Sequence, residues 1–129
     1  MIYLDTSVAL AQLLAEDRHP PAEFWRGTLV SSRLLEYELW TRINAMKLGR
    51  SHVDVVQALL GRVAILELIP EVLGRMRKPF PAPVRTLDAL HLATAAFLVE
   101  RGQAVQVASY DQRMVAAARA MKLPLAELP

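Results

Sequence analysis

The sequence predicts an α/β domain in which helices flank a short, central parallel β-sheet. Short apolar runs alternate with helical segments along the chain, which is the order that connected parallel strands produce. The length of 129 residues suits one domain covering residues 1–129. A composition that is 53% hydrophobic is well above that of a disordered chain and supplies a core.

Four apolar runs are the predicted strands, and the residues that follow them matter most. They span residues 2–4, 28–31, 65–69 and 104–109, and residues 123–128 are predicted as an edge strand. The first run ends in Asp5-Thr6-Ser7, residue types that favour the start of a helix. In parallel sheets the functional site lies at the carboxyl ends of the strands.

Helices are predicted between these strands, over residues 8–15, 22–26, 32–48, 51–63, 71–78, 87–100 and 111–121. The helix over 32–48 carries an apolar stripe of Leu35, Leu39, Ile43 and Met46, and Gly49 is its predicted stop. The helix over 87–100, with Thr86 as its predicted cap, is apolar on nearly all sides. We therefore expect it to be central and covered by neighbours.

Composition excludes several classes of protein. There is no cysteine, which rules out a disulfide scaffold, a thiolate zinc site and a cysteine nucleophile, and suits a reducing cytosol. The longest apolar stretch, residues 89–99, is shorter than the ~20 residues of a bilayer span, so we expect a cytoplasmic chain without a membrane partner. The net charge of +2 and an arginine-rich set of bases permit a nucleic-acid partner without requiring one.

Three acidic residues occupy positions that the fold class makes informative. Asp5 follows the first strand, Asp111 follows the fourth, and Asp88 lies in the first turn of the apolar helix. Taken singly, each is more simply explained as a helix cap, because Asp satisfies free backbone amides at helix starts. Taken together, they point to one edge of one sheet, where like charges repel unless a divalent cation neutralises them.

Mg²⁺ or Mn²⁺ is the cation that this pattern favours. These hard ions take carboxylate oxygens and keep several waters free for a phosphate substrate. Such an ion activates water and stabilises the leaving oxygen of a phosphodiester. The sequence has no glycine-rich phosphate loop after the first strand, no histidine pair with zinc-site spacing and no serine in a strained elbow.

A fourth acid is available on the helix over 32–48, where Glu36 and Glu38 lie on opposite flanks of the apolar stripe. Helical periodicity does not choose between them. The simpler alternative for either is a solvated side chain, and Glu38 can pair with Arg42 one turn further on.

Several other residues have two interpretations. His91, one turn after Asp88, is predicted to be packed and hydrogen-bonded rather than a ligand. The aromatic residues Trp25, Trp40 and Tyr37 are predicted as core or dimer contacts rather than base-stacking platforms. The basic residues flanking the proline-rich linker guide RNA phosphates or form a solvated face, with equal weight; they are Arg75, Arg77, Lys78 and Arg85. Arg113 contacts phosphate or caps its helix.

Four segments, in order, resemble the PIN domains, and within them the VapC-type ribonuclease toxins of toxin–antitoxin pairs. The segments are I-Y-L-D-T-S, S-S-R-L-L-E-Y-E-L, T-L-D-A-L-H-L-A-T-A and A-S-Y-D-Q-R-M-V-A-A-A. They span almost the whole chain. The resemblance assigns the four acids of the family to Asp5, Glu38, Asp88 and Asp111. It gives Thr6 and Ser109 supporting roles near the metal.

The resemblance implies a metal-dependent endoribonuclease that acts on single-stranded or loop regions of RNA. It also implies homodimerisation and inhibition by a cognate antitoxin. One alternative is a non-catalytic PIN-like module that binds RNA or protein. Another is a phosphotransfer receiver, which is disfavoured because the third predicted strand, ending before Pro70, carries no acceptor aspartate.

Overall fold

A four-stranded parallel β-sheet forms the centre of the molecule. The computed structural model describes residues 1–129. The strands lie in the order β3-β2-β1-β4, and each adjacent pair is parallel. They are β1 (Ile2–Leu4), β2 (Leu29–Ser32), β3 (Val63–Leu66) and β4 (Gln106–Ala108). The predicted fold class is therefore confirmed.

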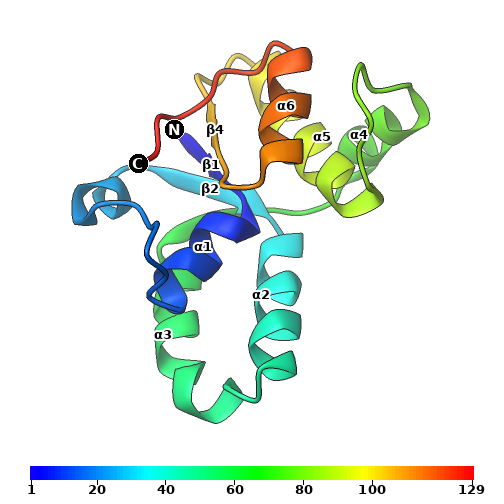
Figure 1. Cartoon of the computed structure of the whole chain (residues 1–129). Helices are drawn as coiled ribbons and strands as arrows, with labels where there is room; N and C mark the ends of the chain where they lie inside the picture. Colours follow the sequence, from blue (N-terminus) through cyan, green and yellow to red (C-terminus); the bar gives the residue numbers. More distant parts are fainter.

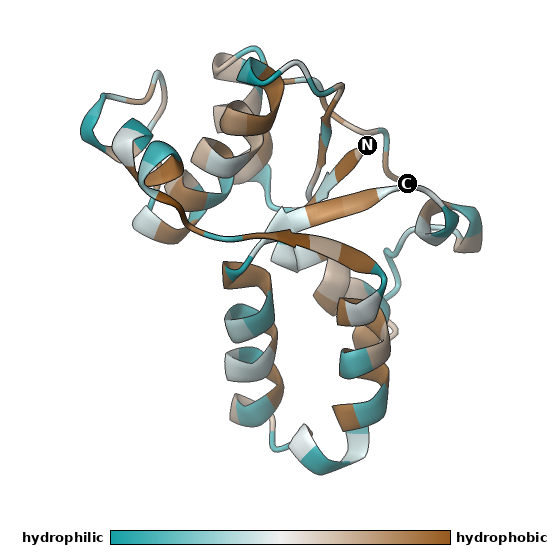
Figure 2. Ribbon diagram, turned by 180° about the vertical axis from the view of Figure 1, so that it is seen from behind, coloured by the Kyte–Doolittle hydropathy of each residue, from teal (hydrophilic) through white to brown (hydrophobic).

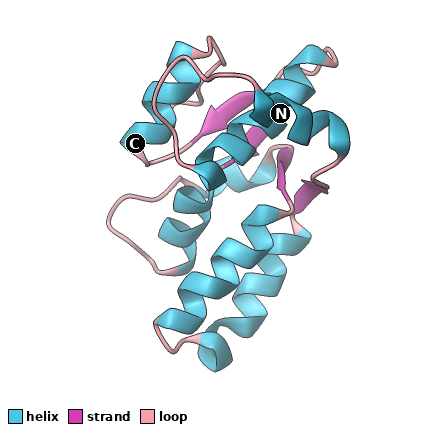
Figure 3. Ribbon diagram, turned by 90° about the vertical axis from the view of Figure 1, so that its right-hand side faces the viewer, coloured by secondary structure: helices cyan, strands magenta, loops and turns pink.

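Helices cover both faces of the sheet, as Figure 1 shows. The helices are α1 (Thr6–Leu13), α2 (Leu34–Ala45), α3 (Gly49–Gly61), α4 (Pro70–Gly74), α5 (Thr86–Glu100) and α6 (Gln112–Ala120), with 3-10 turns η1 (Ala22–Arg26) and η2 (Arg75–Arg77). Helices α1, α2 and α3 lie on one side of the sheet, and α5 and α6 lie on the other. Figure 3 shows α2 and α3 as a pair of adjacent helices joined by a short loop.

The two faces of the sheet bury two separate apolar clusters. Successive strand residues point to opposite faces, so Leu4 packs with the α1–α3 layer and Tyr3 with the α5–α6 layer. In α2 the stripe of Leu35, Leu39 and Ile43 is fully buried, and each such side chain stabilises the fold by roughly 1.5–3 kcal/mol. Figure 2 shows apolar residues on the helix surfaces that face inward.

Several predicted boundaries were wrong near the second strand and its helix. Ser32 belongs to β2, and its Oγ accepts a hydrogen bond from the Leu34 amide at 3.1 Å, so α2 begins at Leu34. Gly49 is the first residue of α3 rather than the stop of α2. The turn instead uses Lys47, whose φ is 59°. Met46 therefore lies beyond the helix and is 49% exposed, outside the buried stripe.

Two further differences come from strand pairing, and a third concerns the start of α5. Strand β3 begins at Val63, because it pairs in register with Leu29 of β2. The predicted edge strand over 123–128 is reduced to one bridge between Val107 and Leu125. Helix α5 has Arg85 rather than Thr86 at its N-cap, with no side-chain cap. No helix combines the length and apolarity that crossing a membrane requires.

The strand order places a topological switch point between β1 and β4. From β1 the chain continues to β2 and β3 on one side, and it returns to β4 on the other side of β1. Loops leave the two strands in opposite directions at such a point, which opens a crevice at their carboxyl ends. The residues directly after Leu4 and Ala108 border this crevice, because these two residues are paired in register.

Candidate active site

All four acids singled out in the sequence line one pocket at this crevice. The pocket has a volume of about 490 Å³, and its acidic lining residues are Asp5, Glu38, Asp88 and Asp111. They come from four elements: Asp5 and Asp111 are the N-cap residues of α1 and α6, Glu38 lies on α2, and Asp88 lies in the first turn of α5. Long-range folding thus brings together residues that are distant in the sequence.

Asp5 occupies an N-cap position, but its carboxylate does not cap the helix. Its Oδ2 atom accepts hydrogen bonds from Ser7 Oγ at 2.6 Å and from Ser109 Oγ at 2.7 Å. Ser109 reaches it because the β1–β4 register sets Leu4 beside Ala108. Asp5 is only 5% exposed, and Oδ1 accepts no hydrogen bond from the protein. Helix capping therefore does not explain this buried carboxylate.

Asp111 does cap its helix. Its Oδ1 atom accepts from the backbone amides of Arg113 at 2.9 Å and Met114 at 3.4 Å. The Asp111 amide in turn donates to Ser109 Oγ at 3.0 Å, so Ser109 connects Asp111 to Asp5. The capping alternative applies to this acid, although Oδ2 remains without a protein donor.

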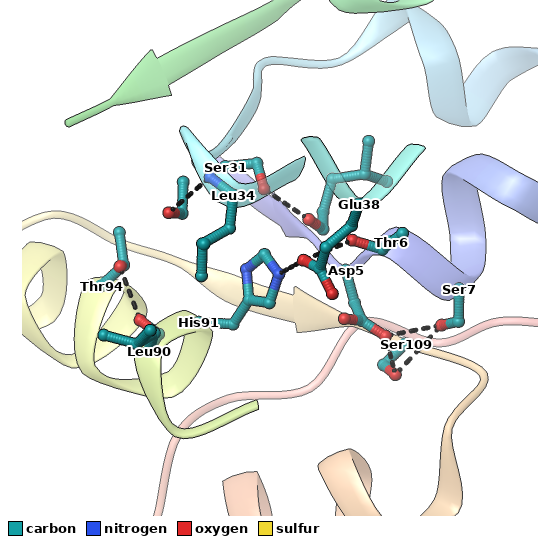
Figure 4. A network of polar contacts seen from close by, with 12 residues as sticks. Asp5, Thr6, Ser7, Ser31, Leu34, Glu38, Leu90, His91, Thr94 and Ser109 are labelled. Atoms are coloured by element: carbon teal, nitrogen blue, oxygen red, sulfur yellow. Dashed lines mark hydrogen bonds and ion pairs between the residues drawn. The ribbon is translucent and has the colours of Figure 1, made fainter. Parts of the chain in front are cut away.

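Glu38, and not Glu36, lines the pocket. Its Oε1 atom accepts from Thr6 Oγ1 at 3.0 Å and contacts His91 Nε2 at 2.5 Å, as Figure 4 shows. Glu36 instead contacts Arg33 at 3.4 Å. The alternative pairing of Glu38 with Arg42 is not among the ion pairs of the chain. Between the two glutamates, the geometry favours Glu38 as the site residue.

Asp88 is the least supported of the four carboxylates. No side chain caps the start of α5, and no ion pair includes Asp88. Burial, followed by the charges of Asp111 and Asp5, raises the pKa of Asp88 above its usual range. His91 acts in the opposite direction and does not cancel the rise in pKa. The charge of Asp88 is therefore unfavourable in the protein alone.

The donor set of the pocket suits a hard divalent cation. The four acids line the pocket, but no three acidic or histidine side chains already converge on a common centre as a closed coordination shell would. Mg²⁺ typically binds one or two carboxylates and keeps several waters, and such a site needs no closed shell. Asp5, Glu38 and Asp111 each hold one oxygen in hydrogen bonds and leave the other without a protein donor.

The sequence pointed to some pocket residues and missed others. Thr6 and Ser109, predicted in supporting roles, contact Glu38 and Asp5 respectively. Ser7 was not singled out, although its place two residues after Asp5 was a usable signal. His91 is packed and hydrogen-bonded as predicted, but its contact with Glu38 was not foreseen. Of the two roles predicted for Tyr37, the core position is wrong, because Tyr37 is 61% exposed at the pocket, and the dimer contact stays a prediction.

The candidate phosphate-binding arginines fall into two groups. Arg85 and Arg113 line a small hollow of about 210 Å³ together with Asp88. Arg75 is engaged elsewhere, since it donates to the carbonyls of Lys78 and Pro79 and its guanidinium lies 4.2 Å from the Phe80 ring centroid.

The fold and the pocket define a class of α/β domain that carries an acidic pocket at the switch point of a parallel sheet. The family model described as PIN domain matches residues 2–120. This chain therefore belongs to the PIN domain family, as its motifs suggested.

Similar proteins support the same assignment. Ribonuclease VapC35 of Mycobacterium tuberculosis is 32% identical over 129 residues, covering 95% of this chain and 93% of the relative. Ribonuclease VapC47 of the same organism is 28% identical over 125 residues, covering 92% and 90%. A crystal structure of VapBC2 from Rickettsia felis, bound to a DNA fragment from their promoter, contains a chain with a TM-score of 0.74. That chain is 16% identical, with full coverage of both, and it supports the fold.

Proposed function

We propose that this chain is a metal-dependent endoribonuclease and the toxin of a toxin–antitoxin pair. The observation that carries the proposal is the pocket in which four acids from four separate elements gather beside the switch point. The relatives that match most of this chain are named VapC ribonucleases, and this supports RNA as the substrate.

Asp5 and Asp88 are the residues that would hold Mg²⁺ or Mn²⁺, directly or through water, with Glu38 and Asp111 completing the pocket. When bound, such an ion would neutralise the acids and would supply the chemistry that activates a water for attack on phosphorus. The chain's own contribution is orientation. Ser7 and Ser109 fix Asp5 through Oδ2, which leaves Oδ1 for the ion.

Residues around the acids suit a single-stranded RNA. Arg42 lies on the pocket wall, and Arg85 and Arg113 flank Asp88 in the adjoining hollow. Arginines so placed bind the phosphates on either side of the cleaved bond and fix the register of the strand. The exposed ring of Tyr37 at the pocket provides a surface on which an unpaired base stacks.

The partners of the proposed enzyme follow from the same family assignment. We expect a cognate antitoxin protein, a homodimer and a cytoplasmic location. Apolar side chains are exposed on α3 and in the turn before it, namely Val55 and Met46, and exposed apolar area of this kind favours protein contacts.

The direct test is RNA cleavage by the purified chain with Mg²⁺ or Mn²⁺, comparing the wild type with Asp5→Ala. We expect a loss of about 10³-fold, since a metal ion supplies several kcal/mol of transition-state stabilisation. Glu36→Gln is the matched control, because Glu36 lies on the same helix as Glu38 but outside the pocket. The proposal is wrong if folded Asp5→Ala cuts RNA at the wild-type rate.

A non-catalytic PIN-like module that binds RNA or protein is the second candidate. Such a module binds RNA equally well with and without a divalent ion. It also leaves RNA intact at protein concentrations equal to that of the substrate, which distinguishes it from a slow enzyme.

A further inference from the structure

A buried chain of three side chains runs from the sheet to the pocket. Tyr3 of β1 contacts His91 Nδ1 of α5 through its hydroxyl at 2.7 Å. His91 Nε2 lies 2.5 Å from Oε1 of Glu38 on α2 (Figure 4 shows this contact). Tyr3 and His91 are each 1% exposed. Three elements that are separate in the sequence thus meet in one hydrogen-bonded line.

The chemistry of the groups fixes the direction of the hydrogen bond between His91 and Glu38. An ionised carboxylate only accepts, so His91 Nε2 carries a proton and donates it to Glu38. The other ring nitrogen, Nδ1, meets the Tyr3 hydroxyl at 2.7 Å. Tyr3 therefore holds from behind the imidazole whose Nε2 faces Glu38.

The orientation of the imidazole is fixed by its packing against Tyr3 as well as by its hydrogen bonds. The rings of Tyr3 and His91 meet edge to face, with centroids 5.7 Å apart and an interplanar angle of 75°. Thr6 Oγ1 donates to the same Glu38 oxygen at 3.0 Å. Two donors thus occupy Oε1, and Oε2 is the oxygen that has no protein donor.

The geometry points to Tyr3 and His91 as positioning residues that act on the divalent ion through Glu38. They hold Oε1 inside the protein, so that Glu38 presents Oε2 alone to the pocket as a single-oxygen ligand. This inference rests on the proposed metal-dependent function. Asp5 has the same arrangement, because Ser7 and Ser109 occupy its Oδ2 atom and leave Oδ1.

The test measures binding of Mn²⁺ to the whole chain by electron paramagnetic resonance, together with kcat and KM for RNA cleavage. Loss of an orienting partner behind a ligand typically weakens metal affinity about 10- to 100-fold. We expect about 10-fold for Tyr3→Phe, which keeps the ring packing, and about 100-fold for His91→Leu. His91→Gln returns a donor toward Glu38 and should recover most of the Mn²⁺ affinity. In Tyr3→Phe and His91→Leu, the loss of RNA cleavage should appear in kcat rather than in KM.

Tyr110→Phe is the matched control, because it also removes a buried tyrosine hydroxyl, one that has no hydrogen-bond partner. Its Mn²⁺ affinity should equal that of the wild type. The urea unfolding curve of each variant is recorded in parallel. If His91→Leu does not fold, the comparison of Tyr3→Phe with Tyr110→Phe decides the outcome.

A double-mutant comparison separates positioning from general loosening of the core. In a Glu38→Ala background, Tyr3→Phe should cause no further loss of Mn²⁺ affinity, because the residue it acts through is gone. An equal loss in both backgrounds overturns the inference. Unchanged Mn²⁺ affinity in Tyr3→Phe and His91→Leu overturns the inference and leaves the proposed function intact. A wild-type chain that binds no Mn²⁺ overturns both.

Discussion

The two halves of the acidic pocket are supported in different ways. In the strand-end half, Asp5 and Asp111 follow β1 and β4 and accept hydrogen bonds from near neighbours in the sequence as well as from Ser109. In the helix half, Glu38 is held by Thr6 and His91, which are distant from it in the sequence. No side-chain cap or ion pair supports Asp88. Sequence neighbours and the pairing of β1 with β4 thus support the first half, whereas the packing of α1, α2 and α5 supports Glu38 in the second.

Among the variants that compare the two halves, Asp88→Asn should have the largest effect on cleavage, because Asp88 is a proposed metal ligand. We expect RNA cleavage to fall by about 10²- to 10³-fold, the scale of losing metal-assisted stabilisation. The metal-free variant should nevertheless be more stable than the wild type by about 0.5–1 kcal/mol, since repulsion is removed but partly screened by solvent. Urea unfolding without metal measures this. A variant less stable than the wild type would contradict the comparison of the two halves.

The pH dependence of that stability gain has a defined sign. The pKa of Asp88 is raised in the folded state by burial and by Asp111 and Asp5. Its charge therefore destabilises the fold progressively as pH rises from the unfolded pKa of about 4 through the raised folded pKa. The stability difference between Asp88→Asn and the wild type should be larger at pH 7 than at pH 4. A difference independent of pH would contradict this assignment.

Ser109→Ala should have an intermediate effect on the strand-end half. The change removes the hydroxyl that donates to Asp5 and accepts from the Asp111 amide. Ser109 is only 8% exposed, so water does not readily replace it. We expect cleavage to fall about 10-fold, since Ser7 still holds Asp5. Ser51→Ala is the control, because Ser51 is exposed and bonds only its own neighbourhood. A loss in both variants would show that the assay responds to serine removal in general.

Substitutions of Asp111 should have the smallest effect on cleavage. They distinguish a helix-capping role of Asp111 from a role in metal binding. Asp111→Ala removes the α6 cap and should lower the free energy of unfolding by about 1 kcal/mol, whereas Asp111→Asn keeps the cap and should leave it nearly unchanged. Thermal or urea unfolding measures the difference. If both variants retain wild-type cleavage, Asp111 is a cap and nothing more.

The same contrast explains how much the sequence could predict. Short-range patterns predicted the strand ends, the apolar helix α5 and the acids beside them. The strand-end residues Asp5 and Ser109 lie together because β1 and β4 pair in register. Element ends were less predictable, because pairing with neighbouring strands moved them. Strand β3 begins at Val63 because Val63 pairs with Leu29, and no local sequence pattern predicts that pairing.

The helix half could not be derived from periodicity. Glu36 and Glu38 are equivalent on the flanks of one apolar stripe, and only the family motif favoured Glu38. The contact that distinguishes them comes from His91, which is on another helix and looked like an ordinary packed histidine. The place of Tyr37 was also hidden, because an aromatic residue on a largely apolar helix usually lies in the core.

Thermal unfolding of the wild type with and without Mn²⁺ is the decisive measurement of whether the gathered carboxylates favour a divalent cation. At a Mn²⁺ concentration of about 100 times Kd, binding to the folded state alone adds about 2.7 kcal/mol, which raises Tm by roughly 8–10 °C for a domain of this size. We expect that rise in the wild type and its loss in Asp5→Ala. A Tm that Mn²⁺ leaves unchanged in the wild type would contradict it.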